Sequence, residues 1–327
     1  MFDTILSFID RHQSFILTTH DTPDADGIGA QMVLAAILKN AGKKVSVINS
    51  DPVPKHLGFL TVTQIIETWN KEKHSSLLEN SAILVLDTSE EYHVGIMGKY
   101  LKKAKEVFTI DHHEQAPRKS IPGFIDSTAA STAELAIELA CHIGISLDPQ
   151  TATAAYAGVV YDTGFFAYPR TSLRTFRAAS KTIEWGTDPN HIYKHLMEQS
   201  SHYAVLLQKQ ALANLEFFAD KQLAVLILSK EDFHLTGADF EDAENIVNIP
   251  LKAKEVQVSL LLKEKPTGEI RCSLRSKGKV NVSKIAQVFG GGGHVAAAGF
   301  KSSKSMEEII KKLLPIVESQ LDSRRGE

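Results

Sequence analysis

Aspartates and histidines are concentrated where β-strands are expected to end in the first half of the chain. The candidates for metal binding are His20, Asp24, Asp26, Asp87, Asp111, His112, His113 and Asp162. Several carboxylates that converge without cations repel one another, so some would have to stay protonated. Aspartate oxygen with imidazole nitrogen and no thiolate suits Mn²⁺, with Mg²⁺, Co²⁺, Fe²⁺ or Zn²⁺ as alternatives. The pattern predicts two divalent metal ions, preferably Mn²⁺, that together activate water and polarise a phosphoryl oxygen.

Each of these residues also has a structural explanation when it is taken alone. Asp24 and Asp26 can cap a helix that starts near Ile28, and Asp87 and Asp162 can cap the turns that follow them. His20 can be an ordinary loop histidine. The joint occurrence favours metal binding, and Asp87, alone after an apolar run, is well placed to bridge two metals.

The elements expected around these residues alternate between strands and helices. Strands are predicted over 15–19, 45–48, 82–86 and 107–110, and helices over 28–40, 132–143, 149–160 and 172–185. This alternation predicts an α/β fold with an N-terminal, mostly parallel sheet covered by helices on both faces. Ligands of such sheets bind outside the carboxyl ends of the strands, where the aspartates and histidines fall.

The second half has a different pattern. A helical stretch is predicted over about 199–217, strands over 223–228, 256–262 and 270–274, and helices over 282–289 and 306–321. A run of four glycines between the last two helices is interpreted as a tight loop. These elements predict a smaller C-terminal α/β domain.

Bulk composition excludes several classes of protein. The 327 residues are 43% hydrophobic and 23% charged, with a net charge of −3, so a sequence-independent coat for long nucleic acid is disfavoured. The two cysteines, Cys141 and Cys272, suggest neither a zinc site nor a disulfide framework. With no apolar span of membrane length and no leader pattern, we expect a cytoplasmic protein that does not contact membranes.

The order of these motifs resembles a known family. His20-x₃-Asp24-x-Asp26, Asp87, Asp111-His112-His113 and Asp162 are similar to the four motifs of the DHH phosphoesterase superfamily. The segment from Gly290 to Phe300, GGGGHVAAAGF, resembles the signature of the DHH-associated domain of the first type. Length and arrangement are similar to the nano-RNase and pAp phosphatase subfamily. The resemblance implies a catalytic domain over 1–188, a helical linker over 189–217 and a substrate-binding domain over 218–327.

The resemblance also implies a role for each residue of the motifs. One metal would be held by His20, Asp24 and Asp87, and the other by Asp26, Asp87, His112 and Asp162. His113 would face the substrate phosphate or assist the leaving oxygen, and Asp111 would orient the histidines. Ser131 and Glu134 occupy a family helix start near the site, but a helix cap explains them equally well.

Substrate binding is expected in the second domain. Residues 252–284 contain nine Lys and Arg against three Glu, and most of these lysines are interpreted as a solvated face. Arg275, which is expected just after a strand, can grip a phosphate with two parallel hydrogen bonds. Glycine lets backbone amides approach a phosphate closely. The predicted substrate-binding residues are Arg275, Gly291, Gly292, Gly293 and His294.

These features and the family resemblance together imply a Mn²⁺-dependent phosphodiesterase and phosphatase with its active site in the cleft between two domains. Its substrates would be oligoribonucleotides of about two to five nucleotides, linear dinucleotides such as pApA and pGpG, or the bisphosphonucleotide pAp, and not long duplexes. A homodimer is compatible with the sequence. Alternatives are a cyclic-dinucleotide phosphodiesterase, a RecJ-like single-strand exonuclease, a manganese inorganic pyrophosphatase and a non-catalytic nucleotide-binding module.

Overall fold

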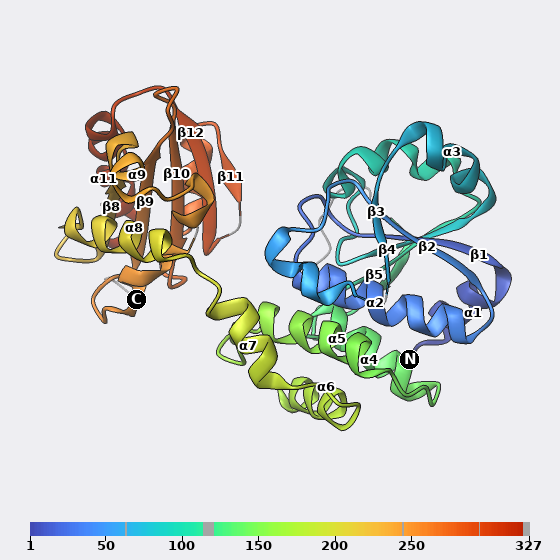
Figure 1. The fold of residues 1–327 in the computed structure, drawn as a ribbon. Coiled ribbons are helices and arrows are strands. Elements are labelled where there is room, and N and C mark those ends of the chain that lie inside the picture. Colours follow the sequence, from blue (N-terminus) through green and yellow to red (C-terminus); the bar gives the residue numbers. More distant parts are fainter. Residues whose placement is uncertain (63, 114–120, 244, 294, 323–327) are drawn as a thin grey trace. The chain divides into compact units, whose positions relative to one another are not determined.

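The computed structural model describes residues 1–322 except for 63, 114–120, 244 and 294. The chain forms two compact units, an N-terminal unit of Met1–Gln199 and a C-terminal unit of Ser200–Glu327 (Figure 1). Each unit has its own sheet and its own hydrophobic core. Among the described residues, no helix is both long enough and apolar enough to span a membrane.

The N-terminal unit is built on a six-stranded sheet in the order β3-β2-β1-β4-β5-β6, and all its neighbouring strands pair in parallel. The strands are β1 (Ser14–Thr18), β2 (Lys44–Asn49), β3 (Ile66–Thr68), β4 (Ala82–Leu86), β5 (Val107–Asp111) and β6 (Gly123–Ile125). The chain adds strands outward from β1 on one side and from β4 on the other. The switch in strand order therefore lies between β1 and β4, where open α/β sheets bind ligands.

Helices cover both faces of this sheet, which confirms the predicted fold class. The α-helices of the unit are α1 (Asp3–Arg11), α2 (Ala25–Asn40), α3 (Lys71–Asn80), α4 (Thr132–His142), α5 (Pro149–Asp162), α6 (Leu173–Glu184) and α7 (Pro189–Met197). The 3₁₀ segments are η1 (Lys55–Leu60) and η2 (Glu91–Lys103). Alternate residues of β4 pack on opposite sides: Leu84 against α1, α2, α4 and α5, and Ile83 against α3 and η2.

Helices α2 and α5 pack very closely, because glycine stands at their contact. A Cβ atom added to Gly29 would lie 2.5 Å from the carbonyl oxygen of Ala154. A Cβ atom added to Gly158 would lie 2.7 Å from the Cβ of Ala133 in α4 and 3.0 Å from a carboxylate oxygen of Asp26. Close packing of these three helices therefore requires hydrogen atoms at both positions.

The C-terminal unit contains a mixed sheet in the order β11-β12-β10-β9-β8-β7, in which only β8 and β9 pair in parallel within the described residues. Its strands are β7 (Glu216–Phe218), β8 (Leu223–Leu228), β9 (Val258–Glu264), β10 (Ile270–Ser276), β11 (Gly292–Gly293) and β12 (Ala297–Ser302). Its helices are α8 (His202–Ala213), α9 (Lys230–Thr236), η3 (Phe240–Ala243), η4 (Ile246–Lys252), α10 (Val282–Val288) and α11 (Met306–Asp322). Helices α10 and α11 cover one face, and α8, η3 and η4 pack against β8 and β9 on the other.

Three local expectations are corrected by this unit. The helix expected to run to about residue 217 ends at Ala213, because the chain then pairs with β8 as strand β7. The glycine run is not only a loop, since Gly292–Gly293 pairs with β12 as a short strand. Arg275 lies inside β10 and not after it, because β12 returns along that strand and extends its pairing.

We predict that Gly29→Ala destabilises the protein although alanine favours helices more than glycine does. The added methyl group would press on backbone atoms of α5, and overpacking of this kind costs about 1–3 kcal/mol. Thermal and urea unfolding should show the loss. Gly58→Ala is the control, because nothing lies within 4 Å of a Cβ added there. Equal stability of Gly29→Ala and the wild type would contradict the close packing.

Candidate metal centre

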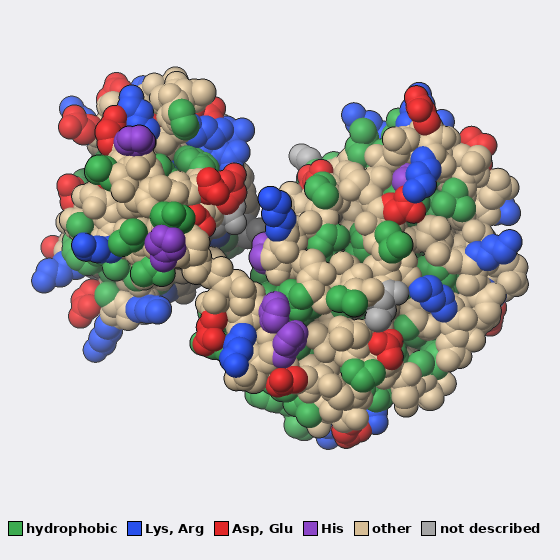
Figure 2. All heavy atoms as spheres, viewed as in Figure 1, with side chains coloured by type: hydrophobic (Ala, Val, Ile, Leu, Met, Phe, Trp, Pro, Cys, Tyr) green, Lys and Arg blue, Asp and Glu red, His purple; other side chains and the backbone are tan. Residues whose placement is uncertain are grey.

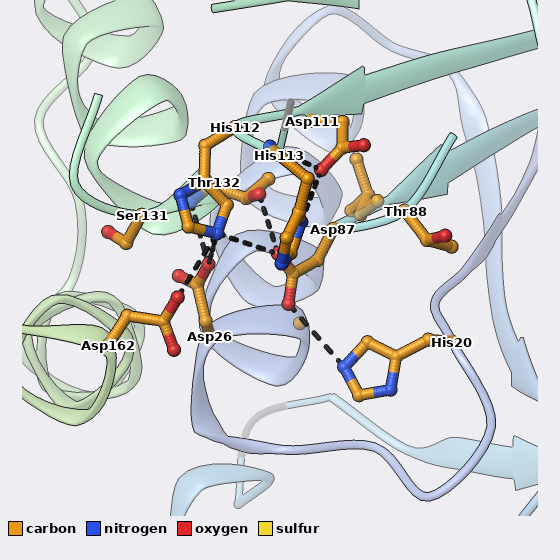
Figure 3. Close-up of polar contacts among 12 residues, drawn as sticks. His20, Asp26, Asp87, Thr88, Asp111, His112, His113, Ser131, Thr132 and Asp162 are labelled. Atoms are coloured by element: carbon orange, nitrogen blue, oxygen red, sulfur yellow. Dashed lines mark hydrogen bonds and ion pairs between the residues drawn. The ribbon is translucent and has the colours of Figure 1, made fainter. Parts of the chain in front are cut away.

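The predicted ligands meet at the carboxyl ends of β1, β4 and β5 (Figure 3). The loop after β1 supplies His20 and leads into α2, Asp87 directly follows β4, and His112 directly follows β5. Asp162 is the last residue of α5, two residues beyond the helix end expected from the sequence. Segments far apart in the chain are therefore brought to the switch point of the sheet.

Asp87 lies between two groups of ligand atoms. One of its carboxylate oxygens is 3.5 Å from Nε2 of His20, and the other is 3.5 Å from Nε2 of His112. Its side chain is 2% exposed, and its φ of +63° lies in the left-handed region. Aspartate tolerates this conformation better than most residues. The turn after β4 therefore places one carboxylate toward both histidines.

The first group consists of His20, Asp24 and Asp87, whose ligand atoms lie within 4.8 Å of one another. Nε2 of His20 is 3.6 Å from a carboxylate oxygen of Asp24. The same aspartate is the N-cap of α2, because its Oδ1 accepts hydrogen bonds from the backbone amides of Asp26 and Gly27. Asp24 therefore caps α2 and also contacts His20, so the two interpretations of this residue are compatible.

The second group consists of Asp26, His112 and Asp162. Nε2 of His112 lies 3.1 Å from an oxygen of Asp162 and 3.8 Å from an oxygen of Asp26. Asp26 is fully buried, in the first turn of α2, and is not a helix cap. Together with Asp87, three carboxylates surround one imidazole.

The N-terminus of α4 neutralises part of this negative charge. Backbone amides of Thr132 and Ala133 donate to the two carboxylate oxygens of Asp26 at 2.7 and 2.8 Å. The hydroxyl of Thr132 donates to Asp87 at 2.9 Å. Free amides and the helix dipole favour an anion at this end of a helix. The sequence predicted the helix start from Ser131, whose hydroxyl accepts the Glu134 amide, but not its contact with Asp26.

Asp111 orients the second histidine of the motif. Nδ1 of His113 lies 2.8 Å from Oδ1 of Asp111, which also accepts the His113 amide at 3.1 Å. The side chain of His113 is 49% exposed, whereas that of His112 is 4% exposed. The two adjacent histidines therefore have different environments, and His113 is the one that faces outward.

The pKa values reflect the crowding of like charges. Burial, together with the charges of Asp87 and Asp162, raises the pKa of Asp26 well above its usual range. Burial also raises the pKa of Asp162. For Asp87, burial is outweighed by the hydrogen bond from His20 and by the charges of the histidines, so its pKa falls to about 2. For His20, burial is outweighed by Asp24 and Asp87, so its pKa rises to about 11.

The donor set fits divalent cations. Nε2 of His112 is buried and makes no well-directed hydrogen bond among the described residues, although carboxylate oxygens surround it. A buried polar atom of this kind needs an explanation, and a cation would satisfy it together with the three carboxylates. Carboxylate and imidazole ligands without thiolate suit Mn²⁺ and related ions.

Two arginines near this cluster belong to no recognisable motif, and the sequence analysis therefore did not identify them. Arg170 donates to the backbone carbonyl of His112 at 3.2 Å. Arg174, in α6, contacts Asp126 at 2.7 Å, Glu138 at 2.6 Å and the fully buried Glu134 at 3.2 Å. Arg174 thus ties α6 to α4, and Glu134 serves this contact. These pairings join segments that only the fold brings together.

The predicted substrate residues lie in the C-terminal unit. Arg275 stands between Ser259 of β9 and Ala297 of β12 in the register of the sheet, and its Nη1 donates to the carbonyl of Leu274. Cβ atoms added to Gly291 and Gly293 would lie within 2.5 Å of carbonyl oxygens, so close strand packing already requires both glycines. Gly292 has open space at that position, and His294 lies outside the described residues.

Comparisons with known proteins agree with this arrangement. Residues 14–159 match the DHH family, N-terminal domain, and residues 220–321 match the DHHA1 domain. A probable bifunctional oligoribonuclease and PAP phosphatase NrnA of Streptococcus mutans is 29% identical, covering 95% of this chain and 97% of that protein. The bifunctional oligoribonuclease and PAP phosphatase NrnA of Thermus thermophilus is 28% identical, covering 93% and 89%.

A solved structure shares the fold over nearly the whole length. It is that of an exopolyphosphatase-related protein of Bacteroides fragilis, 27% identical, with a TM-score of 0.91. The match covers 98% of this chain and 97% of the other. Both sheets of the chain therefore have counterparts in one known protein.

We predict that Mn²⁺ binding at pH 7 releases protons. With a pKa of about 11, His20 is protonated at this pH, and metal coordination requires the neutral ring. The apparent affinity should therefore rise between pH 6 and 8, about tenfold per pH unit for each proton released. Titration calorimetry in buffers of different ionisation enthalpy measures the number of protons.

His20→Asn should lower this number, and His234→Asn, at an exposed position of the C-terminal unit, should leave it unchanged. Identical heats in all buffers would rule out a protonated His20 in the metal-free protein.

Proposed function

The chain belongs to the DHH family and carries a DHHA1 domain after its DHH domain, and from this premise we propose that it hydrolyses phosphate esters of short nucleotides. The proposed substrates are oligoribonucleotides of two to five residues, linear dinucleotides such as pApA and pGpG, and pAp. Similarity to the two NrnA proteins over most of their length supports this choice, because both are named for oligoribonuclease and PAP phosphatase activity.

The observation that carries the proposal is the position of Asp87 between two groups of ligand atoms. We assign one divalent ion to His20, Asp24 and Asp87. We assign a second ion to Asp26, Asp87, His112 and Asp162, and Mn²⁺ is the preferred metal for both. When bound, two such ions would lower the pKa of water and withdraw charge from the phosphoryl oxygens.

The protein side chains have separate tasks in this scheme. The amides of Thr132 and Ala133 hold Asp26 in one orientation, so its carboxylate needs no rearrangement during the reaction. Burial lowers the pKa of His113, but its hydrogen bond to Asp111 and the charge of Asp87 outweigh this effect and raise the pKa to about 9. His113 is then protonated at pH 7, and the ring nitrogen that does not face Asp111 can donate to the phosphate or to the leaving oxygen.

The C-terminal unit is assigned the non-scissile part of the substrate. Arg275 supplies a guanidinium that can bind a phosphate with two hydrogen bonds. The glycines Gly291, Gly292 and Gly293 carry no side chain that would keep a phosphate away from the backbone, and we assign them and His294 to the same site. Product is expected to be a 5′-mononucleotide from oligonucleotides, and AMP with phosphate from pAp.

We predict that Asp87→Ala abolishes Mn²⁺-dependent hydrolysis of every substrate, by more than ~1000-fold. This exceeds the roughly 10–100-fold loss typical of residues that only support a ligand, because Asp87 serves both ion positions. Release of mononucleotides and phosphate from pAp, pApA and short RNA in metal-defined buffer measures the effect. The exposed Asp10→Ala is the control and should retain activity. If the Asp87→Ala variant hydrolysed these substrates at nearly the wild-type rate, Asp87 could not serve both metal positions.

Arg275→Ala should raise KM about tenfold or more while kcat changes less. Loss of a hydrogen bond to a charged group weakens binding by this amount, and the residue holds substrate away from the reacting atoms. Steady-state kinetics with pApA distinguish the two parameters. Lys311→Ala removes the same charge from α11 and should leave both unchanged. A fall in kcat alone would place Arg275 at the reacting phosphate instead.

A further inference from the structure

One face of the C-terminal sheet is only half covered by its own unit. Alternate residues of β10 point away from the core: Arg271, Ser273 and Arg275 lie on the side opposite the buried Ile270, Cys272 and Leu274. On this side, α8, η3 and η4 pack against β8 and β9, in contact with Leu226 and Leu261. The segment η4 also approaches β10. Within the described residues, the part of this side over β10 and β12 is covered less completely. It is called the open face and consists of Arg271, Ser273, Arg275, Ala297, Gly299 and Lys301.

Three cations stand in one row at an end of the open face. In the register of the sheet, Arg271 is directly opposite Lys301 on β12 and Lys263 on β9. Arg271 and Lys301 are exposed, whereas Lys263 is 5% exposed with its ammonium 4.3 Å from the centre of the Phe240 ring. Like charges directly opposite each other destabilise a sheet. An anion bound at this row would relieve the repulsion.

Among the described residues, the acid Glu269 lies beside the row. Glu269 forms an ion pair with Lys265 at 2.9 Å. Its pKa is lowered mainly by the hydrogen bond from Lys265, and the charges of Lys301 and Arg271 lower it further. Glu269 thus faces three cations, Lys265, Arg271 and Lys301, in a chain whose net charge is −3. Lys and Arg side chains gather at the upper right of the C-terminal unit in Figure 2, over the part that carries β11 and β12 in Figure 1.

Between this row and Arg275 the open face has a floor of small residues. Ser273 and Gly299 are paired across β10 and β12, and Ala297 lies opposite Arg275. A Cβ added to Gly299 would lie 3.0 Å from the carbonyl oxygen of Cys272, so the strands leave little room for a side chain there. A flat floor lets a sugar or a base lie close to the sheet, with cations at both ends for phosphates.

The number of phosphates in a ligand decides whether it can occupy both ends of the open face. Arg271 and Arg275 are four residues apart on one strand, which is about 14 Å between their Cα atoms at roughly 3.4 Å per residue. Both side chains are long, so their guanidinium groups can hold two successive phosphates of a single strand. Of the two phosphates of pAp, one is the scissile phosphate, which leaves only one for the C-terminal unit.

We propose that the open face is a binding track for single-stranded oligonucleotides, in which Arg271 and Lys301 hold a phosphate beyond the one that Arg275 holds. The inference rests on the proposed function and narrows it. Oligonucleotides with three or more nucleotides place on this row a phosphate that pAp does not have, so the track favours short RNA over pAp as the substrate.

The test compares pApApA with pAp, using the double variant Arg271→Ala/Lys301→Ala and Mn²⁺. The kcat/KM for pApApA should fall about tenfold or more, through KM, because the variant cannot form hydrogen bonds to the charged phosphate. The kcat/KM of the variant for pAp should equal that of the wild type. The dependence of log KM for pApApA on log salt concentration should also become shallower, by about 0.7 for each phosphate that the variant no longer neutralises.

The matched control is Lys284→Ala/Lys311→Ala, which removes two positive charges from α10 and α11 on the opposite face of the sheet. It should leave both substrates unaffected. Three results would contradict the proposed binding track. The Arg271→Ala/Lys301→Ala variant could lose kcat/KM equally for pAp and pApApA, or it could keep the wild-type kcat/KM for pApApA. The control variant could also lose as much kcat/KM for pApApA as the test variant does. The melting temperature of the test variant should equal or exceed that of the wild type, since removal of two cations relieves repulsion in the row.

Failure of the proposed function is distinguishable from failure of the track. If the wild type hydrolyses neither substrate, the proposed function is wrong, and fluorescence anisotropy with a labelled trinucleotide then decides the inference. Weaker binding by the Arg271→Ala/Lys301→Ala variant than by the wild type supports the track. Equal binding by both proteins refutes it.

Discussion

Repulsion between buried carboxylates is the constraint on which the N-terminal unit depends. Asp26 and Asp87 are almost completely buried, and both lie near His112. Asp162 contacts the same histidine. Such a group of acids is unfavourable unless positive charge compensates it. In the described residues this compensation comes from the protonated imidazole of His20 and from the amides at the start of α4. The divalent cations that we propose would take over this role from the proton of His20.

The architecture around the cluster meets this constraint through close contacts of the backbone. Asp26 is within hydrogen-bonding distance of the α4 amides because α2, α4 and α5 pack against one another through glycine. Arg174 then fixes α4 against α6 through Asp126, Glu134 and Glu138. The proposed metal ligands and the helix packing are thus parts of the same arrangement, and a change at Gly158 would disturb Asp26 directly.

The two units divide the chemistry according to charge. Acidic side chains are buried at the switch point of the parallel sheet, whereas Arg271 and Lys301 are exposed on the open face of the C-terminal sheet. A substrate with several phosphates and one scissile bond requires both environments. Residues 252–284 of the C-terminal unit contain nine Lys and Arg against three Glu, so this segment is basic although the net charge of the chain is −3.

The sequence by itself determined the mostly parallel sheet of the N-terminal unit and the helix start at Ser131, because these depend on local pattern and on residue chemistry. The metal ligands that it predicts remain a prediction, although the fold brings these residues together. Strand β7 and the extension of β10 to Arg275 were missed, since pairing with distant strands overrides the local signal. The contact of Thr132 and Ala133 with Asp26 joins residues more than a hundred positions apart, as does the packing of Gly29 against Ala154. Only the tertiary structure could decide these contacts, because they arise from helix packing and strand register and not from any spacing along the chain.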